Sequence, residues 1–356
     1  MILKTPSLAL SCLLLWCTSS VRLCGQTNQM EKPPIHGLVT MGALAPMFLK
    51  GGHANNLLTE ANAHPGVYSG VVIQVSWDEL EHVEGTLDAS RIDEGLNAVR
   101  TYNKRHPETP VKAKLRVYAG WNTPDWVVLK SGGSFTMESK RGPVVVGRFW
   151  TAAYRQAWRN LQIMLAARYD DDPLMEEVAV SSCSTMTDEP FIIALNPVNI
   201  LTLHAAGFSD ASYQSCLMGA IDDYSSWKRT AIDFTVNPFR DSDSGRPVND
   251  NRFTIAILEA FRKRYGSRGV IANHGLQPAI SDRQEEIASE FRKLGPPIEF
   301  QTIAPSLDWD ASVALGLKYK ATEIEVWNTK DVGGHANVSF DQLKEWAGKM
   351  RPSAAH

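Results

Sequence analysis

The chain has 356 residues, of which 44% are hydrophobic and 21% are charged. This balance is typical of a globular protein and excludes wholesale disorder, a collagen and a coiled coil. The formal net charge is −3, so the chain lacks the basic excess of a nucleic-acid-binding protein, and no nucleic-acid partner is predicted.

The first 25 residues have the pattern of a secretory signal peptide. Lys4 precedes an apolar run from Leu8 to Cys17, which has the length of a signal-peptide core. A membrane span needs about 20 apolar residues, and neither this run nor any later one qualifies, so no transmembrane segment is expected. We therefore predict a signal peptide over residues 1–25 and a secreted or periplasmic location. Cys17 and Cys24 leave lipid anchoring open, but their context does not favour it.

Eight short apolar or β-branched runs alternate with helical patterns along residues 26–356. The predicted strands cover residues 36–45, 70–76, 111–118, 177–182, 230–236, 269–272, 298–303 and 322–327. The predicted helices cover residues 89–105, 151–169, 252–265, 281–294, 311–319 and 340–350. The periodicity is clearest in residues 151–169, where Tyr154, Trp158, Leu161 and Leu165 recur at helical spacing.

This alternation predicts a parallel sheet, and eight units closing on themselves make a single-domain (β/α)₈ TIM barrel. The alternative is an open doubly wound sheet, which usually carries a glycine-rich phosphate-binding turn after its first strand. Residues 41–46 read Met-Gly-Ala-Leu-Ala-Pro and do not match that turn, so the barrel is preferred. The long segment at about 191–227 is predicted to be an insertion over the top face.

Two cysteines, Cys183 and Cys216, certainly belong to the mature chain. In an oxidising compartment they can form one disulfide, and two buried thiols are an equally good prediction. Two isolated cysteines do not make a zinc site of the Cys-x-x-Cys kind.

Polar and aromatic residues end nearly every predicted strand, where the active site of a TIM barrel lies. Indole rings can stack on the apolar faces of sugars, and amide, imidazole and guanidinium groups can bind sugar hydroxyls. The predicted substrate-binding residues are Trp77, Arg116, Trp121, Trp126, Asn237, His274, Gln301 and Trp327. Arg116 could instead bind a carboxylate or sulfate of the substrate.

Cleavage of a glycosidic bond usually needs two carboxylates, one acid and one nucleophile or base. Glu189 is the predicted acid, because it follows an apolar strand in surroundings that could raise its pKa. Glu325 is the leading second carboxylate and Glu299 the next. Glu323 and Glu325 share one strand face, so a structural ion network with Arg116 is the alternative role for this pair. The histidines are scattered, and neither a metal nor another cofactor is predicted.

Several segments resemble the clan-A glycoside hydrolases, in particular the β-galactosidase-like and cellulase-like enzymes. Trp77-Asp78-Glu79 with Gly85 is similar to their segment after the second strand, and Gly120 to Trp126 to their turn after the third. Asp172-Pro173 is similar to the residues before their fourth strand, so the resemblance implies that Glu189 is the acid/base glutamate.

The chain departs from that pattern at two places. Asp188 stands where the clan has asparagine, and the seventh strand carries Glu299 near its start, with Gln301 and Thr302 nearer its end. The clan's nucleophile lies at the end of that strand. Either Glu299 or Glu325 takes the role, or the barrel has lost hydrolysis.

The sequence therefore predicts a secreted glycoside hydrolase that cleaves a poly- or oligosaccharide by paired-carboxylate chemistry. The alternatives are a non-catalytic carbohydrate-binding barrel and a sugar isomerase or lyase on the same fold.

Overall fold

The computed structural model describes residues 30–41, 57–139, 142–303, 308–326 and 338–350. The chain divides into two compact units, Met1–Met30 and Glu31–His356, and all the described helices and strands belong to the second.

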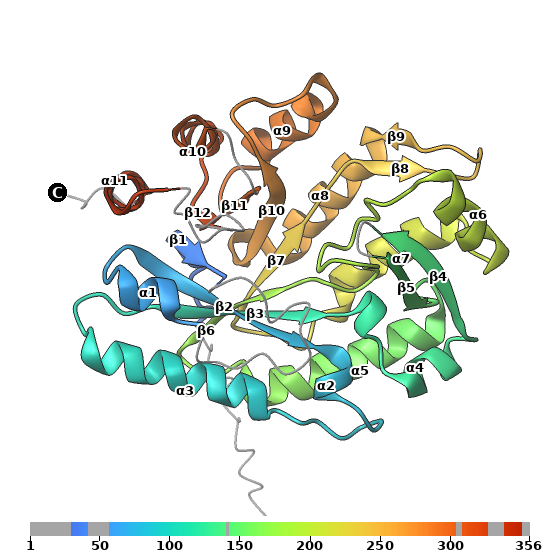
Figure 1. The fold of residues 1–356 in the computed structure, drawn as a ribbon, viewed down its shortest axis with the longest axis horizontal. Helices are drawn as coiled ribbons and strands as arrows, with labels where there is room; N and C mark the ends of the chain where they lie inside the picture. Colours follow the sequence, from blue (N-terminus) through green and yellow to red (C-terminus); the bar gives the residue numbers. More distant parts are fainter. Residues whose placement is uncertain (1–29, 42–56, 140–141, 304–307, 327–337, 351–356) are drawn as a thin grey trace, which may run out of the picture. The chain divides into compact units, whose positions relative to one another are not determined.

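Eight parallel strands close into a barrel in the order β1-β12-β11-β10-β7-β6-β3-β2 (Figure 1). The strands are β1 Gly37–Thr40, β2 Tyr68–Ser76, β3 Lys112–Tyr118, β6 Met175–Ala179, β7 Ala231–Thr235, β10 Gly269–Leu276, β11 Ile298–Thr302 and β12 Glu323–Val326. Each strand pairs with its neighbours along the chain, and β12 pairs with β1 to close the sheet. The predicted (β/α)₈ barrel is confirmed, and each predicted strand overlaps one of these eight.

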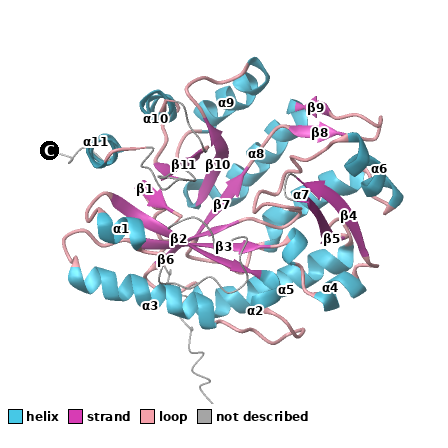
Figure 2. Cartoon of the chain, in the orientation of Figure 1, coloured by secondary structure: helices cyan, strands magenta, loops and turns pink. Residues whose placement is uncertain are grey.

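Helices cover the outside of the barrel (Figure 2). They are α1 Thr59–Ala63, α2 Trp77–Leu80, α3 Ser90–Arg105, α4 Asp125–Lys130, α5 Ala152–Tyr169, α6 Pro197–Ala205, α7 Asp210–Asp223, α8 Asn251–Tyr265, α9 Asp282–Leu294, α10 Trp309–Lys318 and α11 Phe340–Met350. Two antiparallel hairpins, β4 Ser134–Ser139 with β5 Gly142–Gly147 and β8 Phe239–Asp241 with β9 Val248–Asp250, extend the loops after β3 and β7. In the described part of the chain, no helix is long and apolar enough to cross a membrane.

Helix α5 shows how the local sequence produces these elements. The side chain of Thr151 accepts a hydrogen bond from the backbone N–H of Tyr154 and so caps the first turn. Trp158, Leu161 and Leu165 then recur on one face, and all three are fully buried against the barrel. The helix runs over the residues that the periodicity predicts.

The segment at about 191–227, expected to be an insertion, contains α6 and α7. Helix α7 packs between α5 and α8, which is the place of the crossover helix between β6 and β7. Helix α6 packs against β4, where the Asn199 side chain bonds to the backbone N–H and C=O of Glu138. Of the two helices, α6 is therefore the additional one, and it lies against the β4–β5 hairpin.

The structure joins Cys183, which follows β6, to Cys216 in α7 by a disulfide with a Cα–Cα distance of 6.1 Å. Of the two alternatives that the sequence left open, the disulfide is the one formed. It ties the loop that leads from β6 toward Glu189 to the outer ring of helices.

Candidate active site

Charged side chains fill the interior of the barrel, where TIM barrels usually pack branched apolar residues. Because side chains alternate along a strand, Lys114 and Arg116 on β3 share the interior face. Glu323 and Glu325 on β12 do the same, and none of the four residues has any exposed surface. The interior has two levels, one around Lys114 and one around Arg116, nearer the carboxyl ends of the strands.

The first level is a set of four carboxylates around one ammonium group, which we name the Lys114 cluster. The Lys114 Nζ lies 2.8 Å from Asp233, 3.0 Å from Glu323, 3.1 Å from Glu299 and 3.4 Å from Glu177, each distance being to the nearer carboxylate oxygen. One cation cannot balance four buried carboxylates, so some of them must hold protons.

The pKa values of the cluster follow from this imbalance. Burial raises the pKa of Glu177 to about 7, with Lys114 opposing the shift. Burial also raises the pKa values of Glu299 and Glu323 well above their ordinary value. For Lys114 itself, burial opposes the charge, but the surrounding carboxylates outweigh it and raise its pKa. Near neutral pH the cluster thus combines one ammonium group with partly protonated carboxyl groups.

The second level is built on the Arg116 guanidinium. Its two terminal nitrogens donate to the two oxygens of Glu325 at 2.8 Å each, and its Nε lies 2.9 Å from Asp188 Oδ2. Gln301 also donates to Glu325, at 2.7 Å. Burial alone would raise the pKa of Glu325, but Arg116 and Lys114 lower it to about 2.

These contacts contradict three predicted roles. Glu325 is fully buried and both its oxygens accept hydrogen bonds from Arg116, so it is not placed to attack a substrate. Arg116 is fully buried as well, and Gln301 is committed to Glu325, so neither is placed to bind sugar hydroxyls. The structural ion network, which the sequence left as the alternative for Glu325, is what forms.

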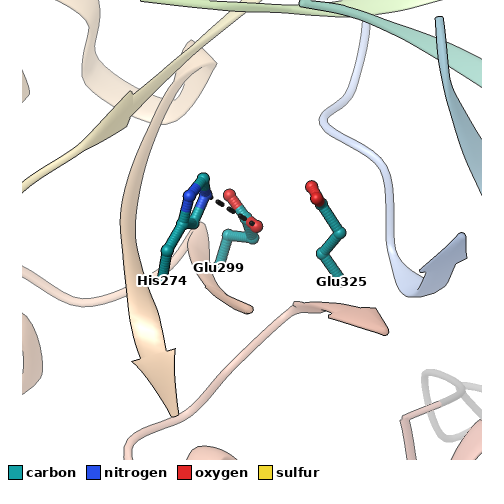
Figure 3. Close-up of side chains that lie close together, drawn as sticks. All are labelled: His274, Glu299 and Glu325. Atoms are coloured by element: carbon teal, nitrogen blue, oxygen red, sulfur yellow. Dashed lines mark ion pairs between the residues drawn. The ribbon is translucent and has the colours of Figure 1, made fainter. Parts of the chain in front are cut away.

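His274 on β10 connects the interior to the barrel mouth. Its Nε2 lies 3.7 Å from Glu299 Oε1, and its Nδ1 lies 3.7 Å from Glu189 Oε1 and 3.8 Å from Asp188 Oδ2. Figure 3 shows the imidazole turned toward Glu299, with Glu325 on the other side of the same space. Burial alone would lower the pKa of His274, but Glu189, Glu299 and Asp188 raise it to about 9. The imidazole is therefore a cation at neutral pH.

One possible set of metal ligands is His274, Glu299 and Glu325, because one ligand atom of each lies within 4.8 Å of the others. Both oxygens of Glu325 already accept from Arg116, and the other oxygen of Glu299 lies 3.1 Å from the Lys114 ammonium. A metal ion would have to displace these cations and deprotonate His274. The donor set does not fit a metal, and we assign none to it.

The pH dependence of stability follows from these shifts. Because Glu177 titrates at about 7 when folded and at 4.5 ordinarily, the folded state binds more protons, and this stabilisation is lost as pH rises from 4.5 to 7. His274, whose pKa is raised from 6.5 to about 9, adds a further loss of stability as pH rises between these two values. The lowered pKa of Glu325 has the opposite effect, a loss of stability as pH falls, but only below pH 4.5. We expect the Tm to fall as pH rises from 4.5 to 8; above 8 the lowered pKa of Lys32, about 8 in the folded state, opposes the change.

Calorimetry across this pH range checks the expectation. The variant Glu177→Gln removes one of the groups and should make the Tm less dependent on pH between 4.5 and 7. A Tm that rises over the whole range would contradict the protonation assigned to the cluster.

Glu189 lies at the mouth, beyond the carboxyl end of β6. Its side chain is 16% exposed, whereas Glu299 and Glu325 are fully buried. The Asn237 side chain, which follows β7, donates a hydrogen bond to Glu189 Oε2. The structure therefore brings together three of the predicted site residues, Glu189, Asn237 and His274. Of the three predicted catalytic glutamates, Glu189 alone reaches solvent.

The loop that carries Glu189 is held close to the loop after β3. Gly120 has a φ of +57°, and a Cβ there would lie 2.1 Å from the carbonyl oxygen of Thr185, so only glycine fits. The next N–H, of Trp121, donates to that same oxygen at 3.0 Å. This close approach sets the position of the chain just before Asp188 and Glu189.

The tryptophans fall into different environments. Trp77 is fully buried, donates to Glu81 at 3.0 Å and packs edge-on against Trp158, so its prediction as a sugar platform is wrong. Trp126 is partly exposed and donates to the Glu81 carbonyl at 2.9 Å. Trp121 is partly exposed in the helical turn Gly120–Asn122 that follows β3. Trp327 lies outside the described residues.

Sequence reasoning missed Lys114 and Arg240. A signal for Lys114 exists: Lys112, Lys114 and Arg116 alternate along β3, so their shared face carries three cations in an otherwise apolar run. Lys112 lies at the start of the strand and is partly exposed, while the other two enter the barrel. Arg240 lies in the hairpin after β7, which the sequence did not predict.

No family model matches the chain, and no curated protein matches it. Among solved structures it is similar to endo-glycoceramidase II from Rhodococcus sp., with 12% identity, a TM-score of 0.51, and coverage of 88% of this chain and 78% of the other. It is also similar to a β-galactosidase from Rahnella sp. R3, with 13% identity, a TM-score of 0.48, and coverage of 90% of this chain and 57% of the other. A Thermomonospora fusca β-mannanase matches with 13% identity, a TM-score of 0.45, and coverage of 89% of this chain and 87% of the other. At these identities the likeness is one of fold, and it agrees with the barrel that the resemblance implies.

Proposed function

We propose that the protein hydrolyses glycosidic bonds in a poly- or oligosaccharide, with Glu189 as the proton-transferring residue. The observation that carries this proposal is the position of Glu189 at the carboxyl ends of the strands. There it is reachable by a ligand, bonded to Asn237 and backed by His274. Likeness in fold to an endo-glycoceramidase supports it. The signal peptide over residues 1–25, which lie outside the described residues, and secretion belong to the same proposal.

The chemistry differs from the paired glutamates that the sequence predicts. Glu189 gives a proton to the leaving oxygen, and the imidazolium of His274, 3.7 Å away, stabilises the carboxylate left behind. Water supplies the new hydroxyl group, and the proton that it loses restores Glu189. Thr235 is a positioning residue, because its hydroxyl lies 3.0 Å from the other ring nitrogen of His274 and fixes the ring. Glu299 lies 3.7 Å from the same nitrogen and helps to keep the imidazole charged.

One observation favours a second candidate function, saccharide binding without cleavage. Retaining hydrolysis needs two carboxyl groups about 5–5.5 Å apart, and inverting hydrolysis needs about 6.5–9.5 Å with room for water. Glu299 and Glu325 are sealed inside the barrel, so of the predicted pairings none presents two accessible carboxylates.

The two functions are separated by measuring cleavage and binding on the same ligands. We expect purified protein to release reducing ends from at least one member of a panel of plant, algal and bacterial polysaccharides, without added metal. Saturable binding by calorimetry with no new reducing ends, even after prolonged incubation, would establish the binding function instead.

A further inference from the structure

A cavity of about 290 Å³ lies beside the loops that follow β6 and β7, and Asn237, which bonds to Glu189, is part of its wall. This is the small end of the range for ligand sites and suits about one sugar ring. The polar residues that line it include Asn237, Arg240, Asn249 and Gln284, and the apolar ones include Ile192 and Ile193. Since Asn237 also donates to Glu189, a ligand that contacts Asn237 in this cavity is one side chain away from the proton-transferring residue.

The hairpin β8–β9 determines which side chains face the cavity. Arg240 and Asn249 are opposite each other in the antiparallel register, so they share one face of the hairpin. Asp241 and Asp250 alternate with them and lie on the other face. Consistent with this, burial and the neighbouring charges of Asp210, Asp250 and Asp243 raise the pKa of Asp241. Arg240 is not among the groups that shift this pKa.

Arg240 is a half-buried cation without an acidic partner among the described residues. Its Nη2 donates to the backbone carbonyls of Ile192 and Ile193, which leaves Nε and Nη1 without a protein acceptor in that part of the chain. Burial lowers its pKa, and of its surroundings only Tyr213 opposes this. A guanidinium in this state gains most from an anionic ligand, because it binds carboxylate and sulfate groups through two parallel hydrogen bonds.

We infer that this cavity is a subsite for an acidic sugar, whose carboxylate or sulfate group binds Arg240 while amides of the cavity bind its hydroxyls. The inference rests on the proposed function, since it names the substrate class of the same site. It also moves the anion-binding role, which the sequence assigned to Arg116, to a residue that a ligand can reach.

Binding measurements in the Glu189→Gln background test the inference without any dependence on turnover. The probes are a uronic-acid oligosaccharide, its methyl ester, and neutral and sulfated oligosaccharides of the same length. We expect the acid or the sulfate to bind about tenfold or more tightly than the neutral ligand. Arg240→Gln should remove this preference, and Arg240→Lys should keep part of it. Arg264→Gln, which alters an exposed arginine of α8 paired with Asp222, is the matched control and should change nothing.

The outcomes separate the two proposals. Because Arg240 also holds the backbone at Ile192, unchanged affinity of Arg240→Gln for the neutral ligand shows that the cavity is intact. Equal affinity of the Arg240-intact protein for acidic and neutral ligands, or a preference that survives Arg240→Gln, overturns the subsite. Cleavage of neutral glycans without a preference for acidic ones supports hydrolysis and rejects the acidic-sugar subsite. Acid-selective binding without cleavage in the native protein supports the subsite and rejects hydrolysis.

Discussion

Replacing Glu189 by glutamine is expected to lower kcat for glycoside hydrolysis by about 10²–10⁴-fold, the contribution of a positioned general acid or base. Glutamine has nearly the same shape and can still meet Asn237, but it has no proton to give to the leaving oxygen. Ligand binding and the Tm should change little, because the side chain lies at the mouth and not in the buried ion network. Steady-state kinetics, calorimetric binding and a melting curve on one preparation measure all three.

Glu79→Gln is the matched control for this substitution. Glu79 is also partly exposed, and its carboxylate bonds to Arg91 and Ser76, neither of which we place in the site. It should retain the full rate. If Glu189→Gln cleaves as fast as the control, Glu189 is not the proton donor and the mechanism proposed for this barrel fails.

Replacing Lys114 by methionine is expected to destabilise the fold by about 3–5 kcal/mol or more near neutral pH. That range is typical when one partner of a buried ion pair is removed and the other charge is left unpaired. Here four carboxylates lie within 3.4 Å of the Lys114 ammonium, and all are sealed from water. The loss should shrink as pH falls toward 4.5, the ordinary pKa of Glu177, Glu299 and Glu323, because protonation then replaces the missing cation.

Lys112→Met tests the same chemical change two residues away on the same strand. Lys112 is 39% exposed and pairs with Glu176, so its loss should cost about 1 kcal/mol or less. Denaturant unfolding of both variants at two pH values provides the comparison. Equal stability of the two variants would mean that the cluster is held together by protons without help from the ammonium.

Local patterns were sufficient to predict the architecture. All eight barrel strands and six of the helices follow from apolar runs and helical periodicity, since each element must bury one face regardless of its neighbours. Glu189 was found in the same way, as a carboxylate after an apolar strand. The helices α6 and α7 were not separated, because their packing partners, β4 for one and α5 and α8 for the other, lie far away in sequence.

The roles of the charged residues depended on distances that no local pattern contains. Glu299 and Glu325 have the residue type and strand position of a catalytic carboxylate. Each is instead bound by a cation of β3, Glu299 by Lys114 and Glu325 by Arg116, and so belongs to the buried ion network. Trp77 likewise has the chemistry of a sugar platform but is enclosed by Trp158.

Residue type and periodicity thus established that this chain is a (β/α)₈ barrel with acidic and aromatic residues at its strand ends. Which carboxylate meets solvent, which cysteines join and which arginine faces a cavity were settled when the barrel closed. Closure places strands from opposite ends of the chain within a few ångströms of one another. The partners and protonation of each buried charged group then depend on its distances to other groups in the fold, which do not follow from the order of residues in the sequence.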